Sequence, residues 1–334
     1  MAQVPICDVP PEPDYVRFSE GFGQRFLLTV DTEEEFDWNA PFERDAHTLE
    51  TIPALKEFIR LCESFDVVPV FLIDYPVAAS KAAADLLKPA IAAGIAEIGL
   101  QLHPWVNPPH EESVSEFNSF AGNLAKELEQ AKFTELRDTI ERNFGVPPRI
   151  FRCGRYGAGA NTAAILAQGG IAIDTSVRSR FDYRPGGGPN YCGHPVRPYW
   201  LDRTAGLIEL PLTTVYWGLL RQIGDWLQLH LANRPRLRGA LSRLGLLDRI
   251  PLTPEGVTLD EAIRGIDVAI DEGLPVLVFS FHSPSLAPGH TPYVRSPDDV
   301  GRLYDWWRQV FAHLARRGIA PASVAEIMAA AKLA

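Results

Sequence analysis

Short runs of apolar residues alternate along the chain with stretches in which apolar positions recur at helical spacing. The first run, at residues 26–30, places bulky residues side by side, which a strand with one solvent-facing side would not do. Such runs are typical of strands buried on both faces, as in a parallel sheet. We predict strands at residues 26–30, 67–73, 96–102, 149–152, 171–174, 207–212 and 275–281. We predict helices at residues 48–65, 76–94, 114–144, 161–168, 259–272, 297–318 and 323–333.

The order of these segments, a strand and then a helix about seven times, predicts a parallel sheet. The pattern suits either a closed barrel or an open sheet. The chain has no GxGxxG after the first strand and no GxxxxGK[ST], so no motif supports a nucleotide-binding fold. Residues 217–247 interrupt the alternation as a helical insertion, and residues 178–205 form a long Gly/Pro/aromatic loop, which we expect to be a lid or wall. We expect residues 1–24 to form an extended arm and residues 25–334 to form one barrel-like domain.

Composition narrows the classes of partner. The 334 residues carry a net charge of −10, which argues against nucleic acid or an anionic membrane as a partner. No apolar run is long enough to span a membrane. The N-terminal sequence lacks the features of a secretory signal, and the four cysteines are far apart, with no CxxC pair. We therefore expect reduced thiols in a cytoplasmic protein.

Acidic, imidazole and guanidinium side chains stand where the predicted strands end. Asp31 and Glu33 follow the first strand, His103 and Arg152 follow two later ones, and His282 follows the last. Burying an unpaired carboxylate is costly, so the acidic residues must be solvated, paired or bound to a metal. The alternative interpretation is that the acidic residues after the first strand mark the N-terminus of a helix, where negative charges are favourable. Together the side chains suit hydrolysis, with a carboxylate base, a metal or arginine that polarises the substrate, and a histidine acid.

Four stretches around these residues resemble the motifs of polysaccharide deacetylases, the NodB-homology carbohydrate esterases. The matching residues are Asp31 and Glu33 in TVDTEEEF, His103 in EIGLQLH, Arg152 and Tyr156 in FRCGRYG, and His282 in FSFH. The four motifs keep the family's order and extend over most of the chain. The resemblance implies a distorted (β/α)7 barrel and a carbohydrate or other small-molecule substrate.

The resemblance also implies a role for each matched residue. Asp31 would take a proton from the attacking water, and His282 would protonate the leaving group. Arg152 would orient Asp31 and favour its ionised form, and the backbone N–H of Tyr156 would stabilise the oxyanion. The implied reaction removes an acetyl or another acyl group from an N-acetylated sugar or glycan precursor. The expected substrate-binding residues are Trp105, Arg155, Tyr183 and Trp217, with Tyr191 as a further member of an aromatic wall.

Gln101 departs from the family's pattern. The second motif of this branch is expected to read His-Leu-His-Pro-Trp, and its first histidine is Gln101 here. The other common form, His-x-x-x-His, would place its second histidine at Trp105. The resemblance therefore implies that Glu33 and His103 are ligands of a divalent metal, of which zinc is the first expectation. Because a neutral amide is a poor zinc ligand, we expect the metal to be weakly bound or absent, and we expect no organic cofactor.

Two other functions remain open. One is a metal-independent hydrolase of a non-peptide C–N bond in a ureide or cyclic amide, and the other is a non-catalytic carbohydrate-binding relative. The presence of both Asp31 and His282 favours an enzyme over a binding protein. Asp174 and Glu209, at two other strand ends, are weaker candidates that in the simplest interpretation only satisfy neighbouring groups.

Overall fold

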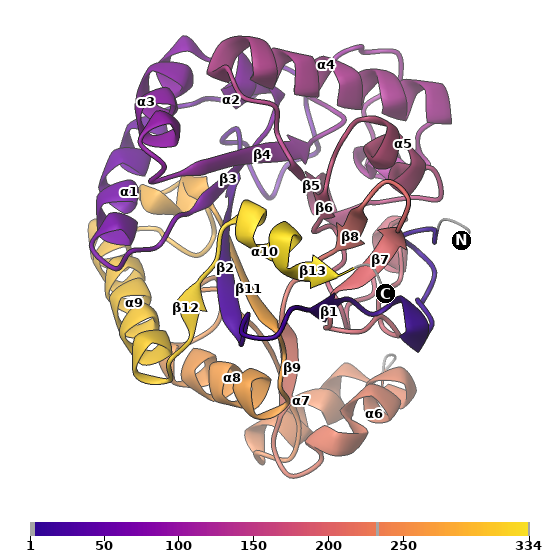
Figure 1. The fold of residues 1–334 in the computed structure, drawn as a ribbon, viewed down its shortest axis with the longest axis vertical. Coiled ribbons are helices and arrows are strands. Elements are labelled where there is room, and N and C mark those ends of the chain that lie inside the picture. Colours follow the sequence, from indigo (N-terminus) through magenta and orange to yellow (C-terminus); the bar gives the residue numbers. More distant parts are fainter. Residues whose placement is uncertain (1–3, 232–233, 333–334) are drawn as a thin grey trace.

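The computed structural model describes residues 4–231 and 234–332, and it contains a curled sheet surrounded by helices (Figure 1). Seven strands run parallel in the order β11-β2-β3-β4-β5-β6-β8, and β7 adds an antiparallel edge. Their bounds are β2 Arg25–Thr32, β3 Val70–Ile73, β4 Glu97–Leu102, β5 Ile150–Cys153, β6 Ile173–Asp174, β7 Tyr199–Asp202, β8 Leu207–Glu209 and β11 Val276–His282. The fold is thus the expected distorted (β/α)7 barrel, and it remains open between β11 and β7 in the described part of the chain.

Ten α-helices lie in the described part of the chain, and most of them surround the sheet (Figure 1). Their bounds are α1 Leu55–Glu63, α2 Tyr75–Ala79, α3 Lys81–Ala92, α4 Lys126–Phe144, α5 Thr162–Gln168, α6 Gly224–Leu231, α7 Pro235–Arg243, α8 Leu259–Asp271, α9 Pro297–Arg316 and α10 Val324–Ala330. Helices α8, α9 and α10 each begin at a capping box, in which a Ser or Thr and an acidic residue three positions later satisfy each other's backbone N–H groups.

Two predicted helices differ from the observed ones. Residues 76–94 split into α2 and α3 because Ser80 is extended and its hydroxyl caps the first turn of α3. Residues 114–144 become α-helical only at α4. Gly122 in the earlier part donates its N–H to Gly157 and packs so closely against Gly159 that a side chain there would clash with the backbone. This contact holds the preceding segment in short 3-10 turns.

Strand alternation decides which side chains face the inside of the barrel. In β2, Phe26, Leu28 and Val30 pack outward among the helices, and Leu27 packs inward. Side chains of a strand alternate between its two faces, so Thr29 and Asp31 share the inward face of Leu27. The interior is crowded, because a Cβ atom on Gly99 of β4 would come within 2.6 Å of neighbouring strands.

The two ends of the barrel differ. At the N-terminal ends of the strands, Val324 and Ile327 of α10 join the inner apolar cluster and close the barrel. A cavity of about 610 Å³ beside α10 is lined mainly by apolar residues, and the carboxylate of Glu97 at its edge caps this helix. Parallel barrels carry their chemistry at the C-terminal ends of the strands, which is where the polar side chains gather in this protein.

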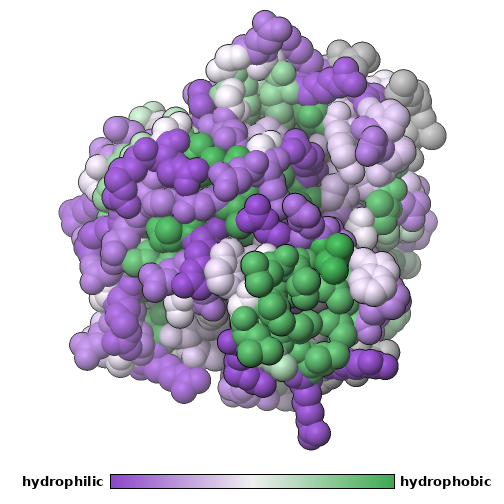
Figure 2. Space-filling view, turned by 90° about the horizontal axis from the view of Figure 1, so that it is seen from below, coloured by the Kyte–Doolittle hydropathy of each residue, from purple (hydrophilic) through white to green (hydrophobic). Residues whose placement is uncertain are grey.

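Three additions surround this core. Strands β9 (Thr214–Trp217) and β10 (Asp248–Pro251) pair antiparallel, and α6 and α7 lie between them in sequence. Seen from the side on which α6 and α7 lie, the surface carries a cluster of hydrophobic side chains (Figure 2). Strand β1 (Arg17–Phe18) of the N-terminal segment pairs with β13 (Ala331–Lys332), and β12 (Ala320–Pro321) pairs with the start of β2. Strand β7 forms part of residues 178–205, which the sequence suggested to be a loop.

Candidate active site

A pocket of about 320 Å³ opens at the C-terminal ends of the parallel strands. It brings together nine of the eleven residues that the sequence assigned to catalysis, substrate or metal. These are Asp31, Glu33, His103, Trp105, Arg152, Arg155, Tyr156, Tyr183 and His282. They lie in or after five strands, which are β2, β4, β5, β6 and β11, so the pocket depends on most of the sheet.

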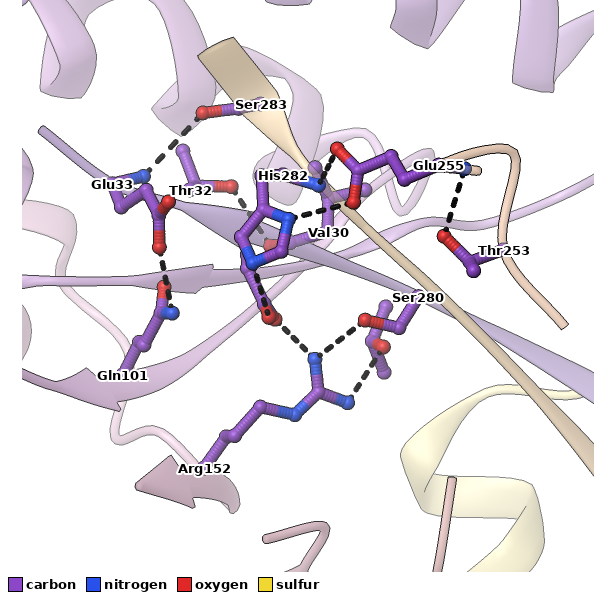
Figure 3. A network of polar contacts seen from close by, with 12 residues as sticks. Val30, Thr32, Glu33, Gln101, Arg152, Thr253, Glu255, Ser280, His282 and Ser283 are labelled. Atoms are coloured by element: carbon purple, nitrogen blue, oxygen red, sulfur yellow. Dashed lines mark hydrogen bonds and ion pairs between the residues drawn. The ribbon is translucent and has the colours of Figure 1, made fainter. Parts of the chain in front are cut away.

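Asp31 and Arg152 form the floor of the pocket. Arg152 in β5 points inward and donates to the carboxylate of Asp31. It also donates to Ser280 Oγ at 3.1 Å and to Thr29 Oγ1 at 2.8 Å, and its Nε donates to the carbonyl of Thr175. Several fixed acceptors therefore hold the guanidinium in place, and the guanidinium in turn holds Asp31 (Figure 3).

His282 lies directly beside Asp31, because the register of β11 against β2 pairs these two residues. Its Nε2 is 3.8 Å from Asp31 Oδ2. The side chain of His282 is 21% exposed, against 2% for Asp31, so the imidazole is the more accessible of the two to a substrate. His282 and Asp31 thus face each other at one place, and Arg152 holds Asp31 from the other side.

Glu255 holds the other side of the His282 ring. Its Oε2 is 2.7 Å from His282 Nδ1, and its Oε1 accepts from the backbone N–H of His282 and from Ser285 Oγ (Figure 3). Burial opposes the imidazolium charge, but Glu255, Glu33 and Asp31 outweigh it and raise the pKa of His282 to about 10. His282 is therefore protonated at neutral pH, which is the form that a general acid needs.

Glu33, Gln101 and His103 line the opposite side of the pocket. Gln101 Nε2 donates to Glu33 Oε2 at 2.9 Å, and His103 Nε2 is 3.4 Å from the same oxygen. Burial raises the pKa of Glu33 to about 7, although the nearby charges of His282 and His103 oppose the rise. Gln101 Oε1 is buried and has no hydrogen-bond partner in the described part of the chain.

A fully buried cluster behind His103 fixes its ring. His103 Nδ1 is 2.9 Å from Glu34 Oε2, and Trp105 Nε1 donates to Glu34 Oε1 at 2.9 Å. The backbone N–H of Glu34 donates to Asp74. Burial raises the pKa of Glu34 to about 8 and that of Asp74 well above its usual range. With Nδ1 held by Glu34, the Nε2 atom of His103 is left facing Glu33.

Two groups of side chains offer ligand atoms for a divalent cation. Glu34, Asp74 and His103 place ligand atoms within 4.8 Å of one another, but their hydrogen bonds to one another and to Trp105 already occupy them. The carboxylate of Glu33 and Nε2 of His103 instead face the pocket, and the unpartnered oxygen of Gln101 lies beside them. A carboxylate behind a metal-binding histidine is a common arrangement, which here makes Glu34 the orienting residue. Glu33 and His103 therefore fit a cation, with an oxygen-rich set of donors.

The mouth of the pocket is aromatic and basic. Arg155 and Tyr156, which follow β5, both have positive φ angles of 56° and 60°, a strained conformation that clusters at functional sites. Tyr183 lies against Tyr156 on one side. On the other side, the ring of Trp38 meets His282 at 5.1 Å and Tyr293 at 6.0 Å, between ring centres.

Two of the predicted residues, Trp217 and Tyr191, lie outside the pocket. Trp217 ends β9 and packs under the guanidinium of Arg264, so its expected place in the aromatic wall is wrong. The antiparallel pairing of β9 with β10 carries it away from the barrel mouth. Tyr191 is buried below the wall, and its hydroxyl donates to the carbonyl of Tyr156.

The remaining strand-end carboxylates have structural partners. Asp174 accepts from Ser176 and Glu209 accepts from the backbone of Val177, in agreement with the simpler interpretation. Glu35 does not share the face of Asp31, because strand pairing ends at Thr32. Its carboxylate instead accepts from the backbone N–H groups of residues 50 and 51.

Sequence patterns missed four residues of the site, which are Trp38, Arg178, Glu255 and Tyr293. Glu255 lies in a turn between β10 and α8, where no periodic pattern marks it. Its only signal is an acidic residue between Pro254 and Gly256. Trp38 lies two residues after the motif TVDTEEEF, but nothing in the sequence indicates which way its side chain points.

Comparison with known proteins supports the fold. No protein-family model and no curated protein matches the sequence. Among solved structures, PuuE allantoinase is 13% identical, with 96% of this chain and 93% of that chain covered and a TM-score of 0.54. A protein from Mycobacterium smegmatis described as a polysaccharide deacetylase is 15% identical, with 95% and 98% covered and a TM-score of 0.47.

A third structure is a family 4 carbohydrate esterase from Streptomyces lividans in complex with acetate. It is 10% identical, with 93% of this chain and 98% of that chain covered and a TM-score of 0.43. At 13% identity, the likeness to the allantoinase structure shows the fold alone. None of the described helices is long and apolar enough to cross a membrane.

Proposed function

We propose that this protein is a hydrolase of the polysaccharide deacetylase type, which removes an acetyl or another acyl group from an N-acylated sugar or glycan precursor. The observation that carries the proposal is the Asp31–His282 pair. The two side chains meet at 3.8 Å in an accessible pocket, and each has its own partner, Arg152 for the base and Glu255 for the acid.

The proposed reaction needs one water molecule. Asp31 takes a proton from the water as its oxygen attacks the acyl carbonyl carbon, and the backbone N–H of Tyr156 stabilises the resulting oxyanion. His282 gives its proton to the leaving nitrogen as the C–N bond breaks. A carboxylic acid and an amine are released, and proton exchange between Asp31 and His282 through water restores both groups.

Glu33 and His103 are the residues that would hold a divalent cation. A bound cation supplies a Lewis acid that polarises the carbonyl and a position that orients the water. Within the chain itself, Glu34 keeps the Nε2 atom of His103 turned to the pocket, and Gln101 fixes the carboxylate of Glu33.

A second candidate is hydrolysis of a non-peptide C–N bond in a ureide or cyclic amide without a metal. The amide at Gln101 favours it, because it removes one expected histidine ligand. The likeness to an allantoinase structure is compatible with this chemistry. A non-catalytic carbohydrate-binding protein is the third candidate, and the complete acid–base pair argues against it.

The test is an activity screen on N-acetylated sugars, sugar nucleotides and ureides, each with and without added zinc. Release of acetate that depends on Asp31 supports the proposed function. Hydrolysis of ureides alone, unaffected by zinc or chelator, would make the second candidate the function. Binding of sugars by wild-type protein without turnover in any condition would favour the third.

A further inference from the structure

Arg178 brings a positive charge into the pocket without a carboxylate partner. Among residues 4–231 and 234–332 no ion pair to Arg178 is found, whereas Arg152 is paired with Asp31, Arg155 with Glu116 and Arg180 with Asp225. The polar contact of Arg178 is to the Tyr183 hydroxyl, at 3.4 Å. Its guanidinium otherwise lies over aromatic rings, 4.0 Å from the centre of Phe181 and 5.2 Å from that of Tyr156.

The position of Arg178 is fixed by the backbone. It lies in the segment after β6, where a parallel bridge to Leu212 ties it to the segment after β8. It lines the pocket together with Asp31 and His282, and it also lines a small adjoining hollow next to Glu255. Its side chain is only partly exposed. A guanidinium in this position has lost part of its hydration, and its contacts with aromatic rings compensate for only part of the lost hydration energy.

The charged groups that line the pocket also favour an anionic ligand. The guanidinium groups of Arg152, Arg155 and Arg178 line the pocket together with the carboxylates of Asp31 and Glu33. Arg152 and Arg155 have carboxylate partners, whereas Arg178 has none in the described part of the chain. Arg178 therefore adds positive charge to the pocket of a chain whose net charge is −10. Such a local positive charge favours an anionic ligand.

We propose that the substrate carries an anionic group, a carboxylate or a phosphate, which Arg178 binds while the acyl carbonyl lies between Asp31 and His282. This inference rests on the proposed function and narrows its substrate to acidic acylated sugars or similar small acids. The planar guanidinium donates two parallel hydrogen bonds to either anion. The pocket volume of about 320 Å³ is suited to one sugar unit rather than to several.

The test compares sugars that differ in charge alone. The probes are N-acetylglucosamine, the corresponding uronic acid with a carboxylate at C6, and N-acetylglucosamine 1-phosphate. Values of kcat/KM are measured for wild type, Arg178→Gln, Arg178→Lys and the control Arg184→Gln. Arg184 lies in the same segment but is exposed and paired with Asp182. Dissociation constants are measured by calorimetry in the Asp31→Asn background, so that binding is read without turnover.

We expect the kcat/KM of wild type to be about 10- to 100-fold higher for at least one charged probe than for the neutral probe. This ratio corresponds to the usual contribution of a hydrogen bond to a charged group. Arg178→Gln should remove this preference through a rise of KM for the charged probe, so that its kcat/KM falls to that of the neutral probe. Arg178→Lys should retain part of the preference, and Arg184→Gln all of it. Whether the uronic acid or the phosphate is preferred identifies the anion. A thermal melt shows that each variant is folded.

Equal turnover of neutral and charged probes by wild type would overturn the inference and leave the proposed function intact. The same holds if the preference survives in Arg178→Gln. Binding of a charged probe that depends on Arg178, without hydrolysis of any acylated probe, would support the subsite and overturn the proposed deacetylase. Failure of both charged probes to bind at millimolar concentration would overturn the inference.

Discussion

Two sides of the pocket differ in how completely their polar atoms are paired. One holds Asp31 and His282, which we propose for acid–base catalysis, and is called the acid–base side. The other holds Glu33 and His103, which we propose for a cation, and is called the metal side.

On the acid–base side, Asp31, Arg152 and His282 all have partners, and Glu255 uses both of its oxygens. On the metal side, one oxygen of Gln101 has no partner in the described part of the chain. The side chains that we propose to transfer protons are thus held by other residues of the chain, whereas the metal side keeps one buried acceptor for a ligand of the pocket.

The largest effect is expected on the acid–base side. Asp31→Asn or His282→Ala should lower kcat by about 10²- to 10⁴-fold, the usual contribution of a general base or acid. The measurement is steady-state kinetics on the substrate found in the screen, with a thermal melt to show that each variant folds. Wild-type turnover in either variant would refute the assigned role.

Gln101→His is the substitution that should complete the set of metal ligands on the metal side. It adds an imidazole next to Glu33 and His103, so zinc affinity should rise. Loss of an outer partner of a ligand already changes affinity by 10- to 100-fold, and a new direct ligand should therefore raise it by at least about 100-fold. Zinc titration of wild type and variant, after elemental analysis of protein purified without chelator, gives the answer. Stoichiometric, tightly held zinc in the wild type would contradict our expectation of weak binding.

Glu255→Gln tests whether the carboxylate sets the proton affinity of His282. The active acid is protonated, so wild-type kcat/KM should fall only as pH rises toward the pKa of about 10. Removing the Glu255 charge lowers this pKa, and the fall should begin at lower pH, with a loss at pH 7 below about 10²-fold. A pH–rate profile measures the shift, and an unchanged basic limb would exclude Glu255 from this role.

The smallest effect is expected at Trp217. Since its ring packs against Arg264 and does not line the pocket, Trp217→Ala should change kcat/KM by less than about twofold. Trp105→Ala should raise KM and weaken metal binding, because Trp105 lines the pocket and donates to Glu34. Equal effects of the two substitutions on KM would contradict the placement of the site.

Local patterns were informative where strand geometry alone decides the outcome. Apolar runs located the seven parallel strands, and the two-residue period of a strand explains why Asp31 lies on the inward face of β2. The same period would place Glu35 on that face, but it holds only while strand pairing continues, and pairing stops at Thr32. The resemblance to deacetylase motifs gathered residues from four strands that no local pattern could have joined.

Tertiary contacts decided the rest. Glu255 reaches His282 from a turn, and Arg178 reaches the pocket through a single bridge to Leu212. Neither contact leaves a periodic trace in the sequence. Trp217 was misplaced because its direction depends on the partner strand β10, which apolar spacing did not reveal. Positions that long-range pairing determines are thus the ones that a single sequence conceals.

The pairing of β2 with β11 also has a consequence for the synthesis of the protein. Thr29 bonds to Phe279 across 250 residues of sequence, so one side of β2 has no partner until the last quarter of the chain has been made. Contacts of such sequence separation form late and slow folding, and an unpaired strand edge invites association with other chains. A growing chain therefore carries Asp31 from the start without His282, and the two residues meet only when the ribosome has released the strand that ends in His282.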